Sequence, residues 1–137
     1  MQGEFRQPVR HMPKPFIPPD VEWFIAEVVE EFKVPDKGCS RVHINTILIR
    51  AKSADEAYEK SISRGRSAEM TFTNTEGENV EVRFRGLRGL FPVYERLEDG
   101  SELLYEKYDC LTDPQIQSFV KAREKLAVFD SGSRDEG

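Results

Sequence analysis

Within the segment 79–85, residues 80–85 alternate strictly between apolar and charged side chains, and this alternation constrains the fold more than any other feature of the sequence. The apolar members are Val80, Val82 and Phe84, and the charged members are Glu81, Arg83 and Arg85. Successive side chains of a strand point to opposite faces, so the pattern predicts a strand with one buried face and one face in water. A sheet with a wet face is typical of antiparallel strands.

Four other segments are rich in β-branched and aromatic residues and predict further strands, at residues 21–32, 41–51, 68–73 and 103–110. For residues 21–32 a helix is the competing prediction, because Glu and Ala are frequent there. Residues 41–51 have two distinct faces, formed by Val42, Ile44, Thr46 and Leu48 on one side and His43, Asn45, Ile47 and Ile49 on the other. Residues 74–77 and the pair Asp99-Gly100 are turn signals between strands.

Two segments carry the signals of helix starts. Ser53 and Glu56 have the spacing of a capping box, and we expect the helix that follows to end at Gly65. Asp113 and Pro114 predict the start of a second helix, with Asp113 as its cap. The apolar stripe of this second helix is formed by Ile116, Phe119, Val120 and Leu126.

The predicted order of elements is β-β-α-β-β-β-α, which indicates an α+β fold with a mainly antiparallel sheet of about five strands and two helices on one face. A chain of 137 residues can bury one hydrophobic core, so we predict a single domain over residues 20–129. Residues 1–19 are rich in proline and predict a flexible N-terminal arm. Residues 130–137 are polar and predict a disordered tail.

The stretch from residue 21 to about residue 109 contains an aromatic first strand with Trp23, an apolar strand that runs into a Ser-x-x-Glu-Ala helix start at residues 47–57, an Asn-x-x-Gly turn within 72–80, and the segments 84–87 and 98–102. Together these features resemble a small bacterial family, the domain-of-unknown-function family 4288. The arm and the last predicted helix lie outside the resemblance. It implies a fold and a bacterial setting, and it implies no activity and no catalytic residues.

The charge balance of the chain bears on its partners. Asp and Glu outnumber Lys and Arg by 25 to 20, which gives a formal net charge of −5. A broad phosphate-binding surface needs clustered basic residues, so nucleic acid is disfavoured as a partner, although a local basic patch stays open.

The length and composition of the apolar segments bear on the cellular location of the protein. No stretch has the composition of a secretory signal or the length of a membrane span, so we expect a cytoplasmic protein without a membrane partner. In that compartment Cys39 and Cys110 are expected to be free thiols, and a bridge between them is the alternative.

The chain offers few residues for catalysis or for metal binding. His11 lies in the arm, and His43 lies on a predicted strand beside Asn45, which makes these two strand residues weak site candidates. Cys39 and His43 are four residues apart, but no second pair of ligands accompanies them. We therefore expect no enzyme activity, no metal and no cofactor.

Arg83, Arg85 and Arg88 are the first candidate interaction residues, because a guanidinium offers a planar fork of donors to a carboxylate or phosphate. Arg64 and Arg66 could lie nearby. The alternative is that these arginines pair across strands with the carboxylates of Glu69, Glu81 or Glu106.

Leu87, Leu90 and Phe91 are the second group of candidate interaction residues. If the sheet bends at Gly86 and Gly89, an exposed apolar patch rimmed by arginine would suit a protein partner. Burial in the core is the alternative.

These features favour a non-catalytic protein-interaction module, with a protein partner or self-association as a homodimer. A nucleic-acid-binding module that uses the arginine-bearing strand is the first alternative. A small enzyme that pairs His43 with a carboxylate is the second.

Overall fold

The structure, a computed structural model, describes residues 17 and 19–129. Residues 17 and 19–105 belong to one compact unit, and residues 106–129 belong to another. Apart from residues 17 and 19, the predicted arm at 1–19 lies outside the described residues, and so does the predicted tail at 130–137.

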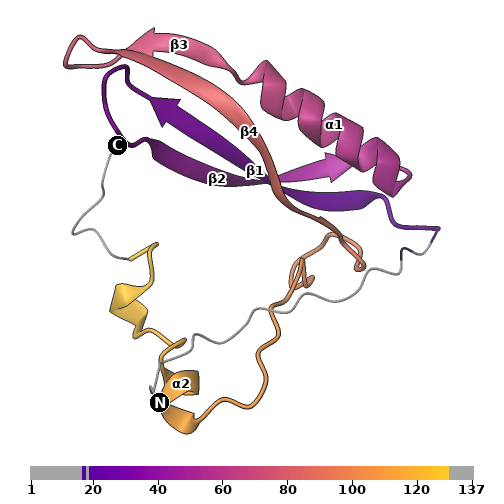
Figure 1. The fold of residues 1–137 in the computed structure, drawn as a ribbon. Helices are drawn as coiled ribbons and strands as arrows, with labels where there is room; N and C mark the ends of the chain where they lie inside the picture. Colours follow the sequence, from indigo (N-terminus) through magenta and orange to yellow (C-terminus); the bar gives the residue numbers. More distant parts are fainter. Residues whose placement is uncertain (1–16, 18, 130–137) are drawn as a thin grey trace, which may run out of the picture. The chain divides into compact units, whose positions relative to one another are not determined.

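The larger unit is built on a four-stranded antiparallel sheet with the strand order β2-β1-β4-β3 (Figure 1). Its elements are β1 (Trp23–Lys33), β2 (Arg41–Arg50), α1 (Ala54–Ser67), β3 (Met70–Thr73) and β4 (Asn79–Pro92). The expectation of an α+β fold with an antiparallel sheet is confirmed, and residues 21–32 form a strand rather than a helix. β1 and β4 are the central strands, so β2 and β3 are the two edges.

The hydrophobic core lies between the sheet and α1. Phe24, Ala26 and Val28 of β1 are buried against Ile49 of β2 and Ala57 of α1. The register pairs Phe24 with Ile49, which places the odd-numbered residues of β2 on the face that α1 covers. The even-numbered residues of β2 therefore lie on the opposite face, as the two-faced pattern at residues 41–51 predicts.

α1 begins where the sequence predicts and extends past its predicted end. The Ser53 hydroxyl accepts from the Glu56 amide at 3.1 Å, while the Glu56 carboxylate accepts from the Lys52 amide instead of completing the capping box at Ser53. The prediction that Gly65 ends the helix is wrong, because α1 continues to Ser67. A Cβ on Gly65 would run into the ring of Phe84, so this glycine serves close packing of α1 on β4 rather than helix termination.

The predicted strand at residues 103–110 does not form, and the sheet of the larger unit has four strands instead of about five. β4 is longer than expected and continues through Gly86 and Gly89 to Pro92. β3 pairs only with Asn79–Val82 of β4, so the second half of β4 has β1 as its one strand neighbour among the described residues. The turn signal at Asp99-Gly100 has no strand after it, although β4 has a free edge on that side in the described part of the chain.

The smaller unit contains α2 (Asp113–Gln117) and a 3-10 helix, η1 (Arg123–Lys125). Thr112, not Asp113, is the cap of α2, and it forms a reciprocal capping box with Gln115. The stripe predicted to run to Leu126 is not one helix, because α2 ends at Gln117. The Ser118 hydroxyl donates to the Gln115 carbonyl at 2.6 Å, a local bond that accompanies the end of the helix.

Candidate functional site

The outer edge of β2 is a run of ten residues without a neighbouring strand among the described residues. The amide of Ala51 donates to the carbonyl of Glu22 at 3.1 Å, which fixes which residues of this strand bond to β1. In an antiparallel pair the residues that bond to one neighbour alternate with those that face away. The odd-numbered residues of β2 therefore bond to β1, and the even-numbered residues direct their N–H and C=O groups to the outer edge.

Apolar side chains follow the same edge on the face away from α1. Val42, Ile44 and Leu48 are 52%, 40% and 45% exposed, respectively. The register places these residues opposite Glu31, Val29 and Ile25 of β1. The residues with outward backbone groups are thus also those with exposed apolar side chains, and we call Val42, Ile44, Thr46 and Leu48 the β2 edge row.

A groove of about 430 Å³ lies at the end of the β2 edge row. It is lined by Trp23, Leu48, Ile49, Arg50, Lys60, Ser63, Arg64 and Ser67, so it joins the end of β2 to residues 60–67 of α1. The ammonium group of Lys60 donates to the carbonyl of Arg50 at 2.6 Å. The Arg50 guanidinium pairs with Glu22 at 2.7 Å and lies 5.4 Å from the ring centroid of Trp23. The groove wall carries three cationic side chains and no carboxylate.

The three candidate arginines of β4 all have carboxylate partners. Arg83 Nε lies 3.2 Å from Glu81, and Arg85 Nη1 lies 2.7 Å from Glu31. Arg88 makes two bonds to the carboxylate of Glu27, from Nε at 3.0 Å and from Nη2 at 3.1 Å. Glu81 is one of the partners considered in the sequence analysis, whereas the two carboxylates from β1 were missed.

Two β-bulges explain how Arg85 and Arg88 come to lie against β1. The register of β4 on β1 shifts between Glu27 and Val28 and again between Val29 and Glu30, so that Arg85 and Arg88 are extra residues without a register partner. A Cβ on Gly89 would lie 2.6 Å from a carboxylate oxygen of Glu27, so a glycine there leaves room for the ion pair. The only indication of these ion pairs in the sequence was that Glu27 and Glu31 are both odd-numbered and so lie on the same face of the strand.

The candidate apolar residues of β4 are divided between the two faces of the sheet. Leu87 and Leu90 are half-buried and pack against the core on the side of α1. Phe91 is paired with Ile25 in the register and lies on the opposite face. The structure therefore does not bring these three residues together as one patch.

The sequence of the larger unit matches one family model. Residues 23–105 match the model of the family described as Domain of unknown function (DUF4288). The chain belongs to this family. The match runs from the first residue of β1 to the last residue of the larger unit, so the DUF4288 domain holds all four strands, α1 and the groove. No curated protein and no solved structure matches the chain.

The weaker candidates His43 and Asn45 lie on the α1 side of β2 in the DUF4288 domain. The His43 ring lies 4.6 Å from the ring of Phe32, and the Asn45 side chain donates to the Glu30 carboxylate at 2.8 Å. Cys39 and Cys110 are exposed free thiols. Within residues 17 and 19–129 there is no cluster of three or more metal-ligating side chains, and no helix is long and apolar enough to cross a bilayer.

Two carboxylates of the DUF4288 domain have perturbed acidities. Hydrogen bonds from Ser40 at 2.6 Å and from Arg85 at 2.7 Å lower the pKa of Glu31 below its usual value of 4.5. The amide of Asn74 and the ammonium group of Lys37 lower the pKa of Glu78. Both groups stabilise connections between chain segments, Glu31 between β1 and β4 and Glu78 around the β3–β4 turn.

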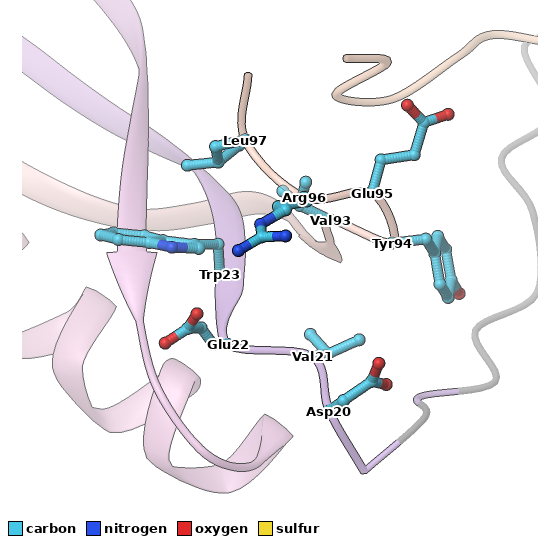
Figure 2. A pocket seen from close by; sticks show the side chains of 9 residues that line it. All are labelled: Asp20, Val21, Glu22, Trp23, Val93, Tyr94, Glu95, Arg96 and Leu97. Carbon is cyan, nitrogen blue, oxygen red and sulfur yellow. The ribbon is translucent and has the colours of Figure 1, made fainter.

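A second hollow, of about 470 Å³, lies on the other side of Trp23 and is formed with residues 93–97 (Figure 2). Val21 and Val93 are buried in its floor. Figure 2 shows the Arg96 guanidinium directed toward Trp23, while Tyr94 and Glu95 point away. Its polar groups are of both signs, and they do not converge on one point as they would around a small charged ligand.

Proposed function

We propose that the DUF4288 domain is a protein-binding module that takes up an extended segment of another protein as an additional strand on the outer edge of β2. The observation that carries this proposal is the coincidence, in the β2 edge row, of outward backbone groups with exposed apolar side chains. Addition of a strand to a sheet edge draws its affinity from main-chain hydrogen bonds and its selectivity from alternate side chains.

The edge lacks the features that usually prevent strand addition. Folded proteins protect edge strands by keeping them short, by placing charges or proline on them, or by bulges. β2 has ten residues, contains no proline, and has no Asp, Glu, Lys or Arg between Arg41 and Arg50. Its pairing with β1 shows no register shift.

The charge of β2 favours a different protein over a second copy of the chain as the partner. Arg41 and Arg50 are cationic, and β2 contains no acidic residue. Two copies of β2 side by side would bring only like charges together, which destabilises a strand pair. A segment with uncharged or acidic residues would not meet this repulsion.

The test is binding of peptides selected from a random library of about ten residues, the length of β2, to the whole chain and to variants of the edge. Thr46 directs its amide to the outer edge. The substitution Thr46→Pro therefore removes a donor to the incoming strand, while the hydrogen bonds to β1 remain. We expect this variant to lose most of the affinity for the selected peptides. Ile44→Lys, which places a charge in the β2 edge row, should also weaken binding of the selected peptides.

The matched control is Arg83→Ala, which changes an exposed side chain of β4 and leaves β2 intact. It should bind the selected peptides like the wild type, and circular dichroism should report a folded protein for all variants. Peptides that bind Thr46→Pro as tightly as the wild type would contradict the proposal. A library from which no peptide is enriched, or a chain that forms a dimer sensitive to Thr46→Pro, would also contradict it.

A further inference from the structure

We infer that the segment bound along β2 is acidic where it leaves the edge row, and that Lys60 and Arg64 of α1 receive its carboxylates in the groove. This inference rests on the proposed function, because it assigns the chemistry of the same bound segment. The edge row and the groove are continuous, since Leu48 belongs to both. A strand that passes Thr46 and Leu48 therefore runs directly to the cationic wall.

The cations of the groove differ in how far they are already compensated. Arg50 is held by Glu22 at 2.7 Å, and its carbonyl occupies one donor of Lys60. An ammonium group has three donors, so Lys60 can bind a further acceptor. Among the described residues, no carboxylate lies within ion-pair distance of Lys60 or Arg64.

The arginines of β4 differ from Lys60 and Arg64 because they have carboxylate partners within the domain. Arg83, Arg85 and Arg88 each lie within 3.2 Å of a carboxylate of the same domain. The whole chain has more acidic than basic residues and a net charge of −5, so carboxylates are in ample supply. Lys60 and Arg64 are instead presented to a groove without one. Charge complementarity thus favours an acidic occupant at this end of the edge.

The acidic side chains would enter from one end of the bound strand. The residues opposite the edge row would pack on Val42, Ile44 and Leu48 and are therefore expected to be apolar at alternate positions. The residues of the bound strand beside Leu48 and Arg50 would lie against the part of α1 that contains Lys60 and Arg64. The partner is accordingly an extended protein segment with alternating apolar residues followed or preceded by acidic ones.

The experiment measures binding of three sets of synthetic peptides to the whole chain by fluorescence anisotropy. All peptides have about ten residues, to match β2, with Val and Thr in alternation, and they carry two Glu, two Gln or two Lys at one end or at the other. We expect a Glu peptide to bind about threefold to tenfold more tightly than its Gln counterpart, as two partly exposed ion pairs would give. The Lys peptides should bind least well, and added salt should reduce the difference.

Variants of α1 assign the effect to the groove. Lys60→Gln and Arg64→Gln should each reduce the preference for Glu over Gln, and the double variant should abolish it without changing affinity for the Gln peptide. The matched control is Arg66→Gln, because Arg66 belongs to the same turn of α1 and does not line the groove. Its preference should equal that of the wild type.

The outcomes separate this inference from the function on which it rests. If Glu and Gln peptides bind equally and Thr46→Pro weakens both, the acidic specificity is wrong and strand addition stands. If Thr46→Pro weakens neither, or if no peptide binds, strand addition itself is contradicted. A single-stranded oligonucleotide that binds more tightly than the Glu peptide, with the same dependence on Lys60 and Arg64, would replace the protein segment by a phosphate chain and overturn the inference.

Discussion

The two edges of the sheet present very different backbones to a possible partner. β3 has four residues, and the turn after it is stabilised by the Asn74 side chain, which accepts from the amides of Glu76 and Glu78. β2 has ten residues and no comparable limit along its length. Short edges are a common protection against unwanted strand pairing. The comparison teaches that this domain has one short edge strand and one long one, and the proposed function assigns the binding of a partner to the long one.

The same contrast appears in the basic residues. The arginines of β4 are matched by carboxylates of β1 and β4, and they form part of the fold. Lys60 and Arg64 lie in a groove at the end of β2 whose lining contains no carboxylate. The arginines of β4, which stand out in the sequence, thus pair within the sheet, and the cations of α1 are the ones that we propose to receive a ligand.

The largest expected effect comes from breaking the ion pair of Arg88 and Glu27. The Glu27 side chain is 7% exposed, and Arg88→Ala removes its bidentate partner. Because the guanidinium itself is half-exposed, we expect a loss of about 1–3 kcal/mol in the free energy of unfolding, below the range for fully buried pairs. Urea denaturation followed by circular dichroism measures it.

The control for this prediction is Arg64→Gln, in the groove. Its stability should stay within about 0.5 kcal/mol of the wild type, as for a surface substitution that breaks no contact. Equal destabilisation by the two substitutions would remove the distinction between structural and available cations.

A smaller effect is expected from pH, through Glu31. The pKa of Glu31 is lowered in the folded protein, so just below pH 4.5 the unfolded chain binds a proton that the folded chain does not. The stabilisation by Glu31 is therefore complete above its ordinary pKa and is lost as the pH falls toward the folded-state pKa. Glu31→Gln should be less stable than the wild type at neutral pH, and the difference should shrink in acid.

Urea midpoints measured between neutral pH and pH 3 would follow this change, with Glu59→Gln of α1 as the control. A difference between wild type and Glu31→Gln that stays constant across this range would show that the hydrogen bonds from Ser40 and Arg85 do not lower the pKa of Glu31 in solution.

Local pattern was sufficient for much of the sheet. The alternation at Val80 and Val82 predicted their buried face, and the two faces of β2 followed from residues 41–51 alone. The start of α1 followed from Ser53. The helix cap depends on contacts between residues that are close in sequence. The strand faces depend only on the alternation of side chains along the strand.

The parts that sequence reasoning missed depend on which strands are neighbours. Nothing in the sequence shows that β4 lies between β1 and β3, and this arrangement leaves β2 at an edge. The pairing of Glu27 with Arg88 depends on a bulge in a ladder between residues 61 positions apart. Glycine is a common residue at helix ends, which is why Gly65 was predicted to end α1. Its place inside α1 is explained by the close approach of the Phe84 ring.

The most direct test of the central claim is amide hydrogen exchange resolved for each residue of β2, with and without the acidic peptide. Without peptide, the amides of Ile44, Thr46 and Leu48 should exchange much faster than those of Ile47 and Ile49, which bond to β1. Bound peptide should slow the first group by at least about tenfold and leave the second group nearly unchanged. Even-numbered amides that are already protected in the isolated chain, or that stay unprotected when peptide is bound, would contradict strand addition at β2.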